Sequence, residues 1–299
     1  MTTLAFSAVR VTGTSTLRVS RPRAVAVRRA VTHRSPRVRR PIVGSASSRD
    51  ENNDPATSGR TIDAFVVPGE PSFPGMYADW SVTKEDKVEV WSYRVCLTTV
   101  ALTTLACASP VLVGQDLPWL SNNLSYFMGA SSLGAALYLI HMYVDPIKKF
   151  MQALWVTGFA GSVGIALTTH EQVPQYVATH PAAVWLVGPM FAALTGVAFK
   201  EGMCYGKPEC AALFFLIPVT LLGHLSGVIG EGGEKGLLVT WCALIAIFAS
   251  RKYTQAVKDD IGDKSVFIWN AMTEVEQGEW LKVTRELDPS RYARLIQEQ

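Results

Sequence analysis

The chain has 299 residues, of which 48% are apolar and 18% are charged, with a formal net charge of +3 at pH 7. These averages fit either one or two soluble domains or a single polytopic membrane unit, so the distribution along the chain must decide. The cysteines are odd in number, form no Cys-x-x-Cys pair and lie mostly in apolar runs, which excludes a disulfide framework; they are Cys96, Cys107, Cys204, Cys210 and Cys242.

The first 49 residues form a basic leader. They contain eleven arginines, scattered serine and threonine, no lysine and no acidic residue before Asp50. This composition, without the apolar core of a secretory signal, predicts an organellar transit peptide over residues 1–49, cleaved near residues 43–48. A disordered arm for nucleic acid is the alternative, but such arms rarely precede membrane spans, so we expect no nucleic-acid partner. Without the leader, 17 basic residues remain against all 25 acidic residues, and the formal charge becomes about −8.

Two short regions separate the leader from the apolar part of the chain. Residues 50–75 are rich in Pro, Gly, Asn, Asp and Ser and predict a disordered linker. Residues 80–94 alternate charged and apolar side chains and predict a short amphipathic helix that lies along the membrane.

Six apolar segments then follow within residues 76–269. A helix needs about 20 residues to cross the hydrocarbon core, and five segments are long enough, whereas the sixth is short. They are apolar on all sides, which argues against a soluble bundle. We therefore predict an all-α fold, a polytopic membrane helical bundle with six transmembrane helices, at residues 95–113, 124–144, 150–168, 182–199, 211–229 and 236–250.

Basic residues alternate between the loops in a way that supports an even number of spans. Eleven of them flank the segments on one side and only Lys235 lies on the other. Flanking basic residues resist translocation, so we expect both mature termini on the same, non-translocated side of the organellar membrane. The eleven are Lys84, Lys87, Arg94, Lys148, Lys149, Lys200, Lys207, Arg251, Lys252, Lys258 and Lys264.

Small residues predict the helix-packing faces, and the end of the chain predicts a polar tail. Glycines spaced for close helix approach are Gly158, Gly161 and Gly164 on the third segment and Gly223 and Gly227 on the fifth. Residues 270–299 are read as a polar, solvated tail whose last helix is N-capped at Asp288.

Ionisable groups inside a membrane are the natural candidates for function. His141 and Asp145 are four residues apart near the end of the second segment, where they either form a direct contact or only hold the loop. Lys200 and Glu201 end the fourth segment, and Lys200 is also long enough to snorkel. Glu201 with Cys204 and Cys210 matches no recognised zinc spacing, so no metal site is predicted.

His224 lies about 21 Å along the fifth segment, whereas His141 is only about 5 Å deep in the second. This difference disfavours a haem shared by the two histidines. His224 is either a ligand or proton site or a buried interhelical hydrogen bond. No catalytic motif is complete, and the sequence identifies no cofactor.

Five segments resemble an uncharacterised integral membrane protein family, a domain of unknown function shared by cyanobacteria and plastids. They are WSVTKEDKVEVWSYR at 80–94, IHMYVDPIKKFMQALW at 140–155, FAALTGVAFKEGMCY at 191–205, LLGHLSG at 221–227 and DDIGDKSVF at 259–267. The resemblance favours a plastid over a mitochondrion but implies no reaction. It adds interest to Asp260, Gly262, Asp263 and Lys264, which are either a solvated turn or a stromal polar cap that docks near His141 and Glu201.

From these features we predict a chloroplast membrane protein, in the thylakoid or inner envelope, with stromal termini. The leading hypothesis is a non-enzymatic scaffold or biogenesis factor whose partners are the lipid bilayer and photosynthetic membrane proteins. The rival is a proton-coupled transporter or small-solute channel that uses His141, Glu201 and His224. A membrane enzyme or pigment-binding protein comes third, and homo-oligomer formation is left open.

Overall fold

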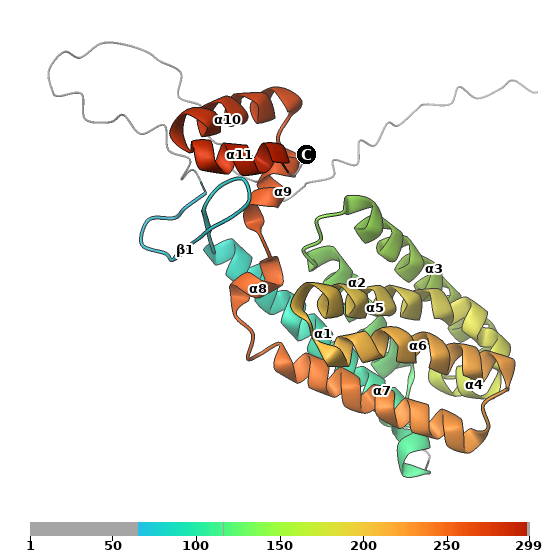
Figure 1. Cartoon of the computed structure of the whole chain (residues 1–299). Helices are drawn as coiled ribbons and strands as arrows, with labels where there is room; N and C mark the ends of the chain where they lie inside the picture. The colour runs from blue at the N-terminus through green and yellow to red at the C-terminus, as the bar shows by residue number, and fades with distance from the viewer. Residues whose placement is uncertain (1–64, 116, 298–299) are drawn as a thin grey trace, which may run out of the picture. The chain divides into compact units, whose positions relative to one another are not determined.

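A computed structural model describes residues 65–115 and 117–297, which are almost entirely helical (Figure 1). The expected transit peptide and residues 50–64 of the expected linker lie outside this part of the chain. The long helices are α1 (Lys84–Val113), α2 (Asn123–Leu139), α3 (Asp145–Thr169), α5 (Val184–Tyr205), α6 (Pro208–Ser226) and α7 (Glu231–Arg251). The short α4 (Val173–Thr179) and the 3-10 helix η1 (Pro181–Ala183) connect α3 to α5.

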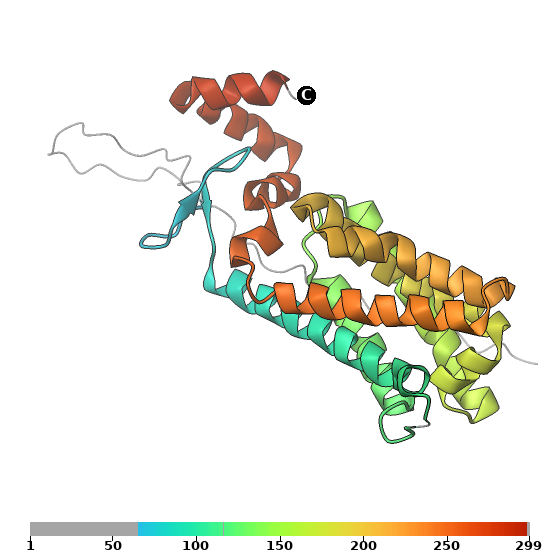
Figure 2. The ribbon, with the colours of Figure 1, turned by 60° about the horizontal axis from the view of Figure 1, so that its bottom comes forward.

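Five of these helical stretches are long and apolar enough to cross a membrane. They are α1, α3, the run Pro181–Tyr205 that includes α5, α6 and α7. The second expected span, residues 124–144, corresponds to α2, which has 17 residues, is about 25 Å long and is not among these five, so six spans are not confirmed. Helix α1 packs along α2 and α7, α3 packs along α5, and α6 lies between α5 and α7. Figure 2 shows α1 and α7 side by side.

Helix α1 differs from the expected pair of elements, because the predicted surface helix and first span are one continuous helix. Thr83 begins it with a capping box, in which its side chain accepts from the Asp86 amide and the Asp86 carboxylate accepts from the Thr83 amide at 2.8 Å. No proline or glycine interrupts the helix before Pro110, so nothing stops it at residue 94. Trp80 and Ser81, expected in that helix, form a strand instead.

Helix α2 ends earlier than expected. The sequence predicted a segment reaching residue 144, but Ile140 is already extended, with ψ of 130°, and the helix ends at Leu139. Lys148 donates to the freed carbonyl of Ile140 at 2.8 Å, and Pro146 disfavours helical backbone just before it. His141 and Asp145 therefore do not share a helix, and the expected i,i+4 relation between them is wrong.

Only part of the expected glycine packing is present. A Cβ on Gly158 would lie 2.3 Å from the Met190 amide nitrogen, and one on Gly161 would lie 2.4 Å from the Leu186 carbonyl oxygen. These two glycines allow α3 to approach α5 closely. Gly164 meets nothing within 4 Å, so its expected packing role is wrong.

The two glycines of α6 do not form a helix-packing face. Gly223 meets only the side chain of Ile229, in the connection that follows α6. Gly227 has open space and ends α6 as its C-cap, with a φ of +65° that favours glycine.

The described ends of the chain form a second folded part, here called the end unit, which consists of residues 65–82 and 257–297. It contains β1 (Ser72–Phe73), β2 (Trp80–Ser81), α8 (Val257–Ile261), α9 (Lys264–Ala271), α10 (Glu274–Leu287) and α11 (Pro289–Gln297). The strands pair antiparallel, with Phe73 opposite Trp80.

The C-terminal helices of the end unit are packed rather than solvated. Tyr77 stacks on Trp269 with ring centroids 4.3 Å apart, Phe65 stacks on Trp280 at 5.3 Å, and Leu295 is buried. Residues 270–297 thus pack on aromatic residues that precede α1, while most of their side chains stay exposed or half-buried. The predicted cap of the last helix is confirmed, since Asp288 accepts from the Arg291 amide at 2.9 Å.

Candidate functional site

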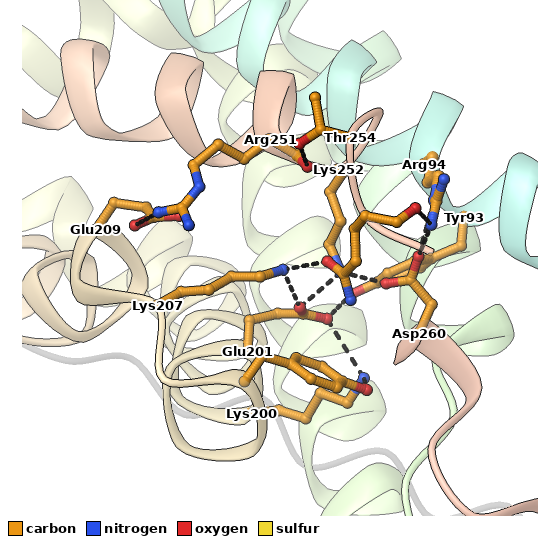
Figure 3. A network of polar contacts seen from close by, with 12 residues as sticks. Tyr93, Arg94, Lys200, Glu201, Lys207, Glu209, Arg251, Lys252, Thr254 and Asp260 are labelled. Carbon is orange, nitrogen blue, oxygen red and sulfur yellow. Dashed lines mark hydrogen bonds and ion pairs between the residues drawn. The ribbon is translucent and has the colours of Figure 1, made fainter. Parts of the chain in front are cut away.

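A cluster of buried charged side chains lies where α1, α5, α6, α7 and α8 meet (Figure 3). We call it the buried network and define it by six charged residues, each at most 7% exposed: Arg94, Lys200, Glu201, Lys207, Lys252 and Asp260. Ionised groups are rarely this buried unless they are paired, so their arrangement decides what the site can do.

Glu201, in the last turns of α5, is at the centre of the network and has no exposed surface. Its Oε2 accepts from Lys252 at 2.6 Å and from Lys207 at 3.1 Å. Its Oε1 accepts from the Tyr93 hydroxyl at 3.1 Å and from Lys200 at 3.3 Å. Each carboxylate oxygen thus has two donors, which is the satisfaction that a buried charge requires.

Asp260, on α8, is the second carboxylate and links the end unit to α1. Arg94 donates to its Oδ2 from Nε at 2.8 Å and from Nη2 at 2.5 Å. Lys252 also donates to Asp260, so one ammonium group bridges Asp260 and Glu201. Arg94 further donates to the carbonyl of Gln255 at 2.8 Å. Residues 252–260, which follow the last turn of α7, are therefore fixed by contacts with α1 and α5.

The electrostatics of the network are set by burial and by mutual attraction. Burial lowers the pKa of Lys207, and the neighbouring Glu201 carboxylate opposes that change. Lys207 also donates to the side-chain oxygen of Gln255 at 2.5 Å. Next to the network, Arg251 pairs with Glu209 at 2.7 Å, with Glu209 buried and Arg251 exposed.

Of the residues predicted as stromal cap candidates, the structure brings Asp260 into the network. Asp263 lies beside it in sequence but binds elsewhere: the Tyr143 hydroxyl contacts its amide nitrogen at 2.5 Å, and its carboxylate accepts from the Met76 amide at 2.6 Å. Lys264 pairs with Asp86 at 2.5 Å. Gly262 has a φ of +79°, and a Cβ there would lie 2.4 Å from the Tyr143 hydroxyl, so glycine is required on both counts.

His141 lies near the network but outside it. Its Nε2 is 3.5 Å from the Glu89 carboxylate, and its ring meets Phe267 edge-on. Asp145 begins α3 and is exposed. The structure therefore connects His141 to α1 and α9, not to Asp145 or Glu201.

His224 lies at the opposite end of α6 from Lys207. Its Nε2 is 2.9 Å from the Val177 carbonyl, which can only accept, so this nitrogen donates. Its Nδ1 is 3.3 Å from both oxygens of Glu234 on α7. These contacts agree with the alternative in which His224 makes an interhelical hydrogen bond. In the described part of the chain, His224 does not contact Glu201.

Sequence reasoning missed four members of the site, namely Tyr93, Arg94, Lys207 and Lys252. The three basic residues were counted as loop charges that fix topology, because a cation at the end of an apolar run usually reaches the interface. The available signal was Arg94, which precedes a long apolar run without a nearby acidic residue on its own helix face. Its partner is 166 positions away.

The described residues contain no group of three or more His, Cys, Asp or Glu side chains that could hold a metal ion. Cys204 is exposed and Cys210 is buried, and both are free thiols.

Comparison with known protein families gives one match. Residues 135–269 match the model of a family described as "Uncharacterized integral membrane protein (DUF2301)". Together with the five candidate spans, this match identifies the class. The chain is an integral membrane protein. The matched residues contain four of the five segments that carried the resemblance, Lys200, Glu201, Lys207, Lys252 and Asp260 of the network, and both His141 and His224.

The matched part of this membrane protein covers less than half of the chain, and Arg94 with the rest of α1 precedes it. No curated protein and no solved structure matches the chain.

Proposed function

We propose that this membrane protein is a scaffold or biogenesis factor for photosynthetic membrane complexes, with the end unit as its docking surface. The observation that carries the proposal is the linkage of the end unit to the bundle. Arg94 and Lys252 connect Asp260 of α8 to α1 and α7. Tyr143 and Asp86 contact Asp263 and Lys264 of the same unit. A unit tied at several separate points is suited to present a fixed surface to a partner.

The proposal includes a plastid location, six membrane crossings and stromal mature termini. The ends of α2 support counting it as the sixth span. Its start contacts the end of α3 through the Asn123 amide and Gln172 at 2.6 Å. Its end contacts the start of α3 through Ile140 and Lys148. The two ends of α2 thus lie near opposite ends of α3, although α2 has 17 residues and α3 has 25, and an even number of crossings follows from the alternation of basic residues.

Topology is tested with single-cysteine variants of an otherwise cysteine-free chain, labelled from one side of sealed membranes. We expect Ser290→Cys and Thr254→Cys to be labelled from the same side, and Thr179→Cys and Gly230→Cys only from the other. Labelling of Ser290→Cys and Thr254→Cys from different sides would refute stromal placement of both the end unit and the end of α7.

The scaffold function is tested by affinity purification from mild-detergent extracts of photosynthetic membranes. Asp260→Asn is expected to lose co-purifying membrane proteins because it loosens the end unit. The control is Asp259→Asn, at the adjacent position, because the Asp259 side chain makes no hydrogen bond or ion pair within the described part of the chain. Equal recovery of photosynthetic or assembly proteins from the wild type and from an unrelated membrane protein would count against the proposal.

Proton-coupled transport is the second candidate, and one observation favours it. Glu201 is a fully buried carboxylate in contact with the Tyr93 hydroxyl and three ammonium groups, a set that is able to hold and pass a proton. Against it, His141 and His224 contact other residues. Proteoliposomes that carry Glu201→Gln with His224→Ala are expected to keep the wild-type flux of protons; loss of a measurable wild-type flux in this variant would favour transport instead.

A further inference from the structure

The buried network carries more positive than negative charge. Its four basic side chains face two carboxylates, and the neighbouring Arg251–Glu209 pair adds one charge of each sign. The formal excess is therefore two positive charges. An excess of this size is unfavourable in a buried site, and either loss of protons or a bound anion relieves it.

Hydrogen-bond donors remain available on one edge of the network. An ammonium group has three N–H donors. Lys207 uses two, toward Glu201 and Gln255, and Lys200 uses two, toward Glu201 and Tyr205. The side-chain nitrogen of Gln255 is buried and has no acceptor among the described residues. One N–H group on each lysine and the side-chain amide N–H groups of Gln255 thus have no acceptor among the described residues.

The same edge is the more open side of the network. Lys200 and Lys207 are each 7% exposed, whereas Glu201 and Lys252 have no exposed surface. The two ammonium groups lie 4.9 Å and 5.1 Å from the centre of the Tyr205 ring, so both are close to the same side chain. The lysines are more exposed than Glu201, the carboxylate that they share.

We propose that the edge formed by Lys200, Lys207 and Gln255 binds a phosphate-bearing anion. A phosphate group has several acceptor oxygens for the three separate donors, and its negative charge offsets the excess of the network. The source is either a phospholipid headgroup, since the edge lies at the end of membrane helices, or free inorganic phosphate.

The proposal is tested with the full chain, purified in phosphate-free detergent. Thermal unfolding is followed while inorganic phosphate is added, and separately while phosphatidylglycerol or phosphatidylcholine is added to the micelles. We expect the midpoint temperature of unfolding to rise with phosphate, with phosphatidylglycerol or with both. A ligand that binds only the folded state stabilises that state. A response to phosphate identifies the free anion, and a response to phosphatidylglycerol alone identifies a headgroup.

Variants separate a specific site from general attraction of anions. Lys207→Met and Lys200→Met are expected to weaken the apparent affinity at least tenfold, and Lys207→Arg to preserve it. Lys149→Met, at an exposed lysine near the start of α3, is the matched control and should bind like the wild type. If Lys207→Met does not fold, Gln255→Leu tests the same edge, with an expected loss of several-fold.

The proposal is overturned if neither phosphate nor phosphatidylglycerol stabilises the wild type, or if Lys149→Met loses as much affinity as Lys207→Met. None of these measurements depends on a protein partner.

Discussion

Arg94 and Asp260 form an ion pair across 166 positions of the chain, with 2.5 Å between Nη2 and Oδ2 and at most 2% exposure of either side chain. The pair joins the first long helix to the short helix after the last one. It shows why the ends of the chain fold together, although residues 65–82 and α8 to α11 carry few features that would identify a domain by themselves.

Removing one partner of this pair should strongly destabilise the protein. Asp260→Ala leaves Arg94 and Lys252 buried without their carboxylate, and we expect the free energy of unfolding to fall by about 3–5 kcal/mol. Reversible unfolding in mixed micelles measures it. The double variant Arg94→Met with Asp260→Leu should be more stable than either single variant. A loss below 1 kcal/mol in Asp260→Ala would show that the pair does not hold the end unit.

Glu201→Gln should be more damaging than the loss of a surface carboxylate. The change keeps the shape of the side chain but leaves Lys200, Lys207 and Lys252 without the carboxylate they share, and we expect a loss of roughly 3 kcal/mol or more. Glu89→Gln is the control, because Glu89 is 39% exposed and should change stability by less than about 1 kcal/mol. Similar losses in both variants would contradict the central place of Glu201.

The contact between α3 and α5 should not tolerate a side chain at Gly158. A methyl group there would lie 2.3 Å from the Met190 backbone nitrogen, so Gly158→Ala should cost about 1–3 kcal/mol by forcing the helices apart. Gly164→Ala, on the same helix with open space, should instead be neutral or stabilise by up to about 1 kcal/mol. Thermal unfolding of the two variants side by side checks the difference, and equal midpoints would refute this packing.

The last helix should loosen in acid. Hydrogen bonds from Ser290 and from the Arg291 amide hold the pKa of Asp288 below its usual value. A carboxyl with a lowered folded-state pKa contributes stability that is fully present above its unfolded pKa of about 3.9 and is lost as pH falls through the folded value. The protection of the amides of residues 289–297 against hydrogen exchange, relative to the intrinsic rate at each pH, should therefore fall below about pH 4. In Asp288→Asn this acid-dependent step should be absent; its persistence would assign the step to another group.

The sequence alone determined the class of this protein and much of its helix pattern, because runs of apolar residues and basic flanks are local properties. It placed five of the long helices within a few residues of where they lie. It failed where a contact outside the helix itself decides local structure. Helix α2 stops at Leu139, where Lys148 takes the freed carbonyl, and Trp80 pairs with Phe73 as a strand.

In the buried network, too, the sequence identifies some residues and only the tertiary structure identifies the others. Glu201 could be picked out from the sequence because a carboxylate at the end of an apolar run is unusual, and Asp260 through the family resemblance. Arg94, Lys207 and Lys252 look like interfacial cations until the helices are assembled. Only the tertiary structure decides that they turn inward, since the free energy of a buried ion depends on partners from other helices, up to 166 positions away. It likewise decides that His141 and His224 stay apart from Glu201, because helix ends and not sequence spacing set the distance between them.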